Sequence, residues 1–160
     1  MTTKIGVISD THLRRVTGEI KAIYEHYLAD KDLILHAGDI VSMEIVDFLG
    51  SKDFLGVHGN MDPPEVRELL PRKRVIEVGS CRVGLIHGGG PSSGLEDRVW
   101  GEFQRVDAIV YGHSHRAANH LREGVLFFNP GTATGFSHAN VHSIGILEID
   151  DAIRGEIIIL

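Results

Sequence analysis

The sequence is poor in cysteine, has no long apolar run and carries no excess of positive charge. Its single cysteine, Cys81, excludes an internal disulfide and suits a reducing compartment. No window approaches the roughly 20 apolar residues of a membrane span, and no apolar stretch of the signal-peptide kind follows Lys4. The net charge of −6 argues against a broad electrostatic grip on nucleic acid or an anionic membrane. We therefore expect a cytoplasmic protein without a membrane partner.

The length and composition indicate one globular unit. A chain of 160 residues with 42% apolar and 24% charged residues can bury one continuous core. We found no fixed-period repeat and no linker-like run of Ser, Gly and Pro. The expectation is a single domain over residues 1–160.

Short runs rich in Val and Ile recur along the whole chain. They predict buried strands at 4–9, 32–37, 54–59, 82–87, 108–112 and 125–129. Further strands are predicted at 74–78, 143–149 and 156–160, the last two as a hairpin across 150–155.

Helical patterns lie between several of these runs. An apolar stripe predicts a helix over 19–29, and Ser42 is a good N-cap for a helix through Leu49, with Gly50 just past its end. Shorter helices are predicted at 64–70, with proline in the first turn, and at 94–103. This order of elements favours an α/β fold with two sheets packed face to face and flanked by helices.

Polar side chains follow five of the predicted strands directly. In α/β sheets the carboxyl ends of parallel strands line one edge, where ligands bind. The five strands thus deliver two carboxylates, one amide and four imidazoles to one rim. Glycine precedes three of these groups, where it permits a tight turn and leaves room beside the site. The polar residues are Asp10 and His12, Asp39, Asn60, His87, and His113 and His115.

Carboxylates and imidazoles without a thiolate are ligands for Mn, Fe, Zn or similar divalent ions. Seven such groups are too many for one tetrahedral zinc but suit two ions that share a bridging carboxylate, for which Asp39 is the natural candidate. Asp10, His12 and one of His113 and His115 would complete one ion. Asn60, His87 and the remaining histidine of that pair would complete the other.

Two such ions, typically about 3.5–4 Å apart, would lower the pKa of a bridging water and stabilise an in-line displacement at phosphorus. The expected nucleophile is a metal-bridging hydroxide. The positive centre would hold a small phosphate-ester substrate despite the acidic protein around it. Asp39 and Asn60 are the candidate catalytic residues, and Asn60 and His113 the candidate substrate contacts.

The ordered motifs resemble the calcineurin-like metallophosphoesterase superfamily. Its signature elements correspond here to SDTH, AGD, GNMD, LIHG and YGHSH, in the family's order from Asp10 to His115. The short length and the later stretch 129–132, Asn-Pro-Gly-Thr, resemble its small phosphodiesterase branch. The resemblance implies a four-layer α/β/β/α sandwich of two mixed sheets. It also implies one metal on Asp10, His12, Asp39 and His115, and a second on Asp39, Asn60, His87 and His113.

The sequence departs from the family's larger phosphatases at Met61. Those enzymes carry a histidine there, commonly assigned as the proton donor to the leaving group, whereas methionine has no transferable proton. We therefore expect efficient cleavage of esters with acidic leaving alcohols and poor cleavage of alkyl monoesters. His58 is a candidate substitute acid, with a structural role in its strand as the simpler interpretation.

Several other residues have two interpretations each. Asp62 is expected to cap or turn the chain rather than to act in catalysis. His36 is expected to be a core or supporting histidine rather than a ligand. His138 and His142 are expected either to contact substrate over the site or to belong to a mobile loop.

The residues leave three functions open. The leading hypothesis is a phosphodiesterase with two divalent ions, Mn before Fe, Zn, Ni or Mg, and the same chemistry would serve a phosphomonoesterase. The alternative is a non-catalytic interaction scaffold, because the retromer scaffold subunit of eukaryotes has the same fold and keeps only part of the metal site. A complete ligand set favours the enzyme. The third function is a nuclease, but the sequence shows no basic groove, so nucleic acid is not expected as a partner. A homo-oligomer remains open.

Overall fold

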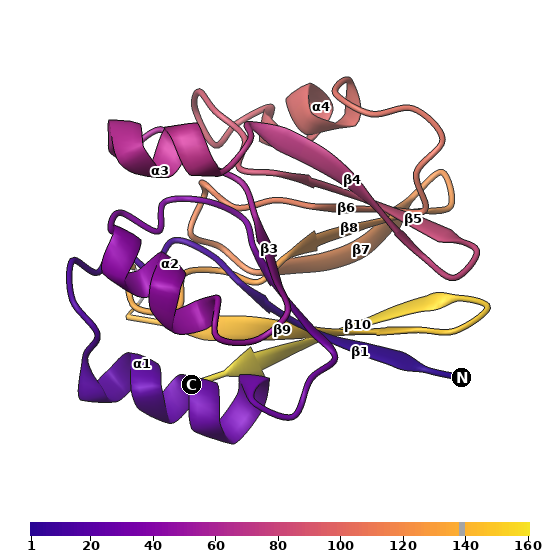
Figure 1. Ribbon diagram of the computed structural model, residues 1–160. Helices are drawn as coiled ribbons and strands as arrows, with labels where there is room; N and C mark the ends of the chain where they lie inside the picture. The colour runs from indigo at the N-terminus through magenta and orange to yellow at the C-terminus, as the bar shows by residue number, and fades with distance from the viewer. Residues whose placement is uncertain (138–139) are drawn as a thin grey trace.

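The protein consists of two five-stranded mixed β-sheets with helices on both outer faces (Figure 1). The computed structural model describes residues 1–137 and 140–160. The first sheet has the order β10-β9-β1-β2-β3 and the second the order β4-β5-β6-β8-β7. The first sheet contains β1 (Thr3–Ile8), β2 (Leu33–His36), β3 (Phe54–Gly56), β9 (Ser143–Ile149) and β10 (Ile153–Ile159). The second contains β4 (Lys73–Val78), β5 (Cys81–Ile86), β6 (Ala108–Val110), β7 (Ala118–Arg122) and β8 (Val125–Asn129).

Each sheet has a parallel part that is continued by antiparallel strands. In the first sheet β1, β2 and β3 run parallel, β9 is antiparallel to β1, and β10 is antiparallel to β9. In the second sheet β5, β6 and β8 run parallel, with β4 and β7 antiparallel at the two edges. The carboxyl ends of the parallel strands therefore gather at one end within each sheet.

Two of the helices begin at a residue whose side chain caps them. The Thr17 hydroxyl accepts a hydrogen bond from the Ile20 N–H at the start of α1 (Gly18–Ile23), which continues as the π-helical turn η1 (Tyr24–Leu28). Ser42 caps α2 (Met43–Leu49) in the same way. Pro64 stands in the first turn of α3 (Pro64–Leu69), and α4 (Leu95–Trp100) completes the set.

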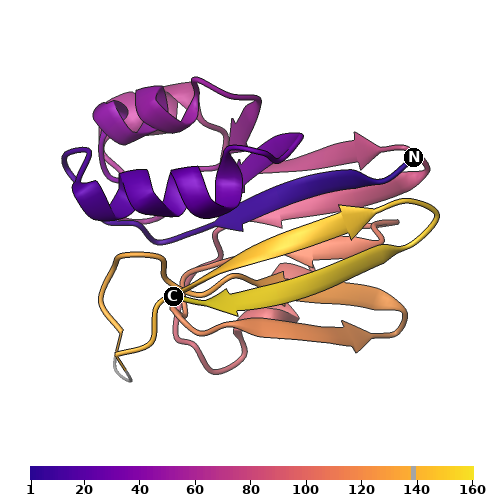
Figure 2. The same ribbon diagram turned by 90° about the horizontal axis from the view of Figure 1, so that it is seen from below.

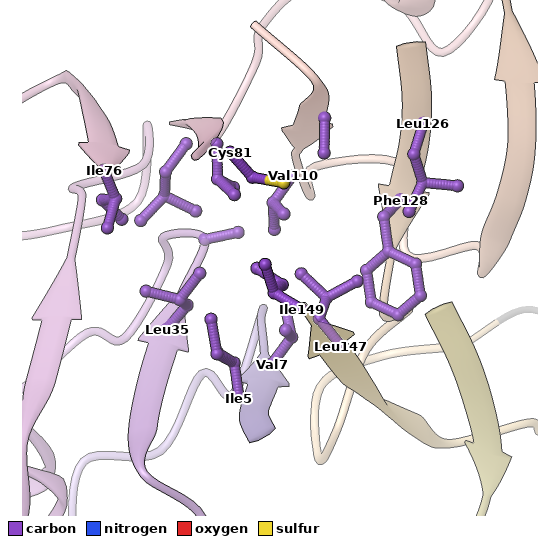
Figure 3. Packing of buried hydrophobic residues seen from close by; sticks show 14 of the residues in the cluster. Ile5, Val7, Leu35, Ile76, Cys81, Val110, Leu126, Phe128, Leu147 and Ile149 are labelled. Carbon is purple, nitrogen blue, oxygen red and sulfur yellow. The ribbon is translucent and has the colours of Figure 1, made fainter. Parts of the chain in front are cut away.

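Three apolar clusters separate four layers. One lies between the sheets and joins Ile5, Val7 and Leu35 to Val110 and Phe128 (Figure 3). A second packs α1 and α2 against the first sheet, and a third packs α4 against the second sheet (Figure 1). Neighbouring residues in a strand point to opposite faces, so Phe128 enters the central cluster and Phe127 the outer one. The predicted four-layer α/β/β/α sandwich is confirmed.

Some predicted elements were wrong in their bounds. The helix expected over 94–103 ends at Trp100, where Gly101 takes the C-cap position. The second strand of the hairpin begins at Ile153, three residues earlier than predicted, because its pairing with β9 continues to Ile149. Strand β7 was not predicted. It is an edge strand with mostly exposed polar residues, so it lacks the apolar pattern on which the other predictions depend.

Candidate metal centre

The loops after five parallel strands bring all seven predicted site residues together. Asp10 and His12 follow β1, and Asp39 follows β2. Asn60 follows β3, His87 follows β5, and His113 and His115 follow β6. Figure 2 shows β1 running from the N-terminus toward the end of the molecule where the chain leaves β8. Contacts of Asp10 with His113 and of Asp39 with His87 join loops of the two sheets. The site therefore lies between the strand ends of both sheets.

The two carboxylates are buried at the middle of the site. Asp10 is fully buried, and its Oδ2 accepts hydrogen bonds from the Ser9 hydroxyl at 2.6 Å and the His113 N–H at 3.1 Å. Its Oδ1 lies 3.2 Å from His115 Nε2 and 3.7 Å from His12 Nε2.

Asp39 stands between residues from both halves of the ligand set. Its Oδ1 accepts the Met61 N–H at 2.8 Å. Its Oδ2 lies 3.5 Å from His12 Nε2 and 3.3 Å from His87 Nε2. This position between His12 and His87 suits the bridging role that the sequence predicted for Asp39.

Backbone carbonyls orient three of the four imidazoles. His87 Nδ1 lies 2.8 Å from the Ala37 carbonyl, and His115 Nδ1 bonds to the Phe136 carbonyl. His113 Nε2 lies 2.6 Å from the Gly90 carbonyl. A carbonyl can only accept, so these nitrogens carry the proton of the neutral imidazole, in which the opposite nitrogen presents a lone pair to the site. Carbonyl-held imidazoles of this kind are prepared as metal ligands.

Two buried polar atoms of the site have no hydrogen-bond partner. They are Asp10 Oδ1 and His12 Nε2. Because an unpaired buried polar atom is costly, a cation between them would remove a penalty that the protein otherwise bears. The residues therefore fit divalent ions.

Two groups of side chains have ligand atoms within 4.8 Å of one another: Asp10, His12 and His115, and Asp10, Asp39 and His87. Asn60 Oδ1 and His113 Nδ1 extend the second group, at 3.1 and 3.3 Å from His87 Nε2. Asp10 belongs to both groups, whereas the resemblance assigned it to one ion only.

The metal-free site holds opposite charges in contact. Burial would raise the pKa of Asp10, but the imidazoles of His115 and His12 close to its carboxylate hold that pKa well below its ordinary value. Burial would also raise the pKa of Asp39, and the hydrogen bond with His87 lowers it overall. The contact with Asp10 raises the pKa of His115 to about 8. Both carboxylates are thus ionised at neutral pH, as metal binding requires.

Five of the seven residues have a left-handed backbone, with φ between 50° and 71°: Asp10, His12, Asp39, His113 and His115. Such a conformation is uncommon outside glycine and asparagine and is unfavourable for an ordinary side chain. Strained backbone of this kind clusters at functional sites, where the surrounding structure enforces it. The backbone at the strand ends is therefore held in a conformation that positions these side chains, although that conformation is locally unfavourable.

Asp62 holds the two loops that carry Asp39 and Asn60. Its Oδ2 accepts the Asp39 N–H at 3.0 Å and the Gly59 N–H at 2.7 Å, and its Oδ1 accepts the Val41 N–H at 2.6 Å. The side chain is buried and ties three backbone donors to one carboxylate. The expectation that Asp62 caps or turns the chain is confirmed.

The stretch 129–132 supports the loops after β1 and β6. The Asn129 amide donates to the Gly112 carbonyl and to the Ser114 hydroxyl, at 3.2 and 3.1 Å. The Thr132 hydroxyl donates to the Asp10 carbonyl at 2.8 Å. Sequence reasoning identified this stretch only through the family resemblance and did not foresee its role. The signal that could have identified this role is Asn129, a buried polar residue at the end of β8.

Glycine is required near the site for two different reasons. Gly38 has a φ of 103°, so it needs the conformational freedom of glycine. A Cβ at Gly59 would collide with Asp39 Oδ1, and one at Gly112 would collide with Ser9 Oγ. At those two positions the reason is space, because neither has a positive φ.

Three further histidines, His36, His58 and His142, contact other parts of the fold near the site. His36 is fully buried, accepts the Gly38 N–H and lies 3.1 Å from the Thr11 hydroxyl, as expected of a core histidine. His58 Nδ1 donates to the Leu70 carbonyl. His142 Nε2 lies 2.8 Å from the Gly135 carbonyl. His138 lies outside the described residues.

Two β-sheets between helices, with carboxylates, imidazoles and an amide at the strand ends, define the class of the metallophosphoesterases. The family model of the calcineurin-like phosphoesterase superfamily domain matches residues 3–152. The chain belongs to this superfamily.

Individual relatives agree with the family. A probable metallophosphoesterase of Methanocaldococcus jannaschii is 35% identical over 164 residues, which cover 98% of this chain and 81% of the relative. A solved archaeal phosphodiesterase is similar in fold, with a TM-score of 0.78, 24% identity and coverage of 99% and 100% of the two chains. Vps29 of Chaetomium thermophilum has a TM-score of 0.77 at 23% identity, covering 99% and 97%. Among the described residues no helix is long and apolar enough to cross a membrane.

Proposed function

We propose that the protein is a phosphodiesterase that depends on two divalent metal ions. The observation that supports this most directly is the pair of buried, unpartnered atoms Asp10 Oδ1 and His12 Nε2, which face the same space. The name of the archaeal phosphodiesterase of the same fold supports the choice of diester.

The proposed ligand set is the one that the family resemblance implies, with Asp39 placed between His12 and His87. Asp10, His12, Asp39 and His115 would hold one ion, and Asp39, Asn60, His87 and His113 the other, with Asp39 shared. When bound, the ions would supply an activated water nucleophile and neutralise charge on the phosphate oxygens. The choice of manganese over Fe, Zn, Ni or Mg stays a prediction.

The chain's own residues would prepare the site for that chemistry. The carbonyls of Ala37, Gly90 and Phe136 keep three imidazoles in the tautomer that presents a lone pair. The Met61 N–H and the Asp62 carboxylate fix Asp39 and its loop. Asn60 and His113 stand beside His87, where we propose that they also contact a phosphate oxygen of the substrate.

The direct test is hydrolysis of bis(p-nitrophenyl) phosphate by metal-stripped protein with each ion added back in turn. We expect activity only with an added divalent ion. Asp39→Asn should lose nearly all of it, because the amide removes the charge of the shared ligand. Substantial activity in that variant, or equal activity in the presence of a chelator, would contradict the proposal.

The exposed Met61 side chain leaves that position without a proton donor. We propose that the leaving group departs largely unprotonated, so that the rate falls steeply as the leaving alcohol becomes less acidic. A series of aryl and alkyl diesters and monoesters measures this slope. A flat dependence would indicate a proton donor elsewhere, and efficient alkyl monoester cleavage would favour a phosphomonoesterase.

A non-catalytic interaction scaffold is the second candidate. The likeness in fold to Vps29 supports it. The absence of any ion-dependent hydrolysis together with stable complexes in solution would favour this candidate. A single domain, a location in the cytoplasm and the homo-oligomeric state stay predictions.

A further inference from the structure

A cleft adjoins the proposed metal centre on the side of His87. Its volume is about 630 Å³, which lies within the range of small-molecule sites. Asn60 and His87 line it together with three arginines, Arg67, Arg72 and Arg98. Because Asn60 and His87 belong to both the proposed centre and the cleft, a substituent on a phosphate held at the centre would adjoin this cleft.

The cleft has a surplus of positive charge in a chain whose net charge is −6. Its two carboxylates, those of Asp97 and Glu102, already form ion pairs with basic side chains. Asp97 lies 2.8 Å from Arg122, and Glu102 is shared between Arg72 at 2.6 Å and Lys73 at 3.7 Å. Among the described residues, neither Arg67 nor Arg98 has a carboxylate partner within the 4.0 Å of an ion pair.

Arg67 and Arg98 are held in place by backbone carbonyls instead. Arg67 donates from Nε to the Asp62 carbonyl and from Nη2 to the Asn60 carbonyl, at 2.7 and 2.8 Å. Arg98 donates to the carbonyls of Gly89, Pro91 and Ser93. A guanidinium has five N–H donors, so each arginine keeps at least two for a ligand. The carbonyls hold both guanidinium groups in place without neutralising their charge. Both groups are therefore pre-organised to bind an anion.

We propose that this cleft binds an anionic substituent of the substrate, so that the preferred esters carry a second negative group besides the scissile phosphate. This inference rests on the proposed function and names the substrate class of the same site. Carboxylate and phosphate groups share the required chemistry, because both accept paired hydrogen bonds from arginine.

The alternative role of the two arginines is to brace loops. Arg67 holds the loop of Asn60, and Arg98 holds the loop whose Gly90 carbonyl orients His113. Bracing alone would affect every substrate equally. Recognition of an anion would affect only substrates that carry one.

A matched pair of symmetrical diesters separates these roles: bis(4-carboxyphenyl) phosphate and bis(4-carbamoylphenyl) phosphate. The two are nearly equal in size, and the carboxamide makes the better leaving group in solution. We expect the wild-type protein with its metal ions to favour the carboxylate diester in kcat/KM by about fivefold, through KM. Because the arginines are exposed, this preference should fall as ionic strength rises.

Substitutions at the two arginines then test the charge. Arg67→Gln and Arg98→Gln should each remove most of the preference, whereas Arg67→Lys and Arg98→Lys should retain it. Arg154→Gln is the control. Arg154 lies on β10, where it pairs with Asp150, so this substitution should leave the hydrolysis of both diesters unchanged. Equal losses on both diesters in the Gln variants, or no preference in the wild-type protein, would overturn the proposal.

Failure of the proposed function gives a different result. If neither diester is hydrolysed with any ion, the same two compounds serve as ligands in titration calorimetry. Tighter binding of the carboxylate diester, lost in Arg67→Gln, would support the anion cleft in a protein that is no hydrolase. Equal affinities would reject the cleft independently of catalysis.

Discussion

Asp62 is the residue on which the geometry of the site most depends without contributing a ligand atom. Its carboxylate accepts three backbone N–H groups from the loops of Asp39 and Asn60. An ionised carboxylate is the side chain best suited to this, because it accepts at both oxygens and has no hydrogen to clash with the donors.

The change Asp62→Asn should weaken metal binding about 10–100-fold, the usual effect of removing a partner that orients ligands. The amide group would point a donor at one or more N–H groups and leave them unsatisfied, so the free energy of unfolding should also fall by about 1–3 kcal/mol. Calorimetric titration with Mn²⁺ and chemical denaturation measure the two effects. The exposed Asp151→Asn is the matched control, and unchanged affinity in Asp62→Asn would contradict this role.

The loops after the strands are the elements that make the site, and the strands determine only where they start. Sequence patterns predicted the strands of both sheets except β7, because alternating or continuous apolar residues report burial directly. The same patterns extended several strands too far. β3 ends at Gly56 rather than at Gly59, and β6 ends at Val110 rather than at Gly112.

The candidate site was more predictable from sequence than the elements that support it. Ligand residue types stood at strand ends, so their convergence followed from the parallel topology alone. The roles of Asn129 and Thr132 could not be predicted in this way. They act through hydrogen bonds to the loops of residues about 15 and 120 positions away, which no local pattern encodes.

Gly112→Ala tests the tight packing of these loops. The added Cβ would collide with Ser9 Oγ and stand 2.7 Å from Asp10 Oδ2, so the Asp10 carboxylate must move. Because displacements of about 1 Å cost on the order of 100-fold in rate, we expect a loss of that size in metal-dependent activity.

The circular dichroism spectrum of Gly112→Ala should stay that of the wild-type protein. Gly18→Ala is the control, since a Cβ there meets no atom within 4 Å. Full activity in Gly112→Ala would show that the Asp10 position is not critical.

The whole molecule combines a well-packed core with a strained, charged end. Three apolar clusters stabilise the four layers, while five left-handed residues and two unpartnered atoms destabilise the strand ends. Bound cations would offset part of that cost. The metal-free protein should therefore fold, with lower stability than the metal-bound form.

Mn²⁺ at about 100 times its Kd should stabilise the protein by about 2.7 kcal/mol per site. For a chain of this length this corresponds to an increase in Tm of about 5–10 °C. Differential scanning fluorimetry with Mn²⁺, and then with excess chelator, measures the rise and its reversal. His12→Gly, which removes a ligand of one ion, should lose the share of the effect that this ion contributes. A Tm that does not respond to divalent ions would mean that the strand ends hold no metal.

The most direct test of the metal centre is anomalous diffraction from crystals soaked in Mn²⁺, recorded on both sides of the manganese absorption edge. We predict two peaks about 3.5–4 Å apart, with Asp39 between them, His12 and His115 beside one and His87 and His113 beside the other. A single peak, or none within bonding distance of Asp39, would contradict a dinuclear centre.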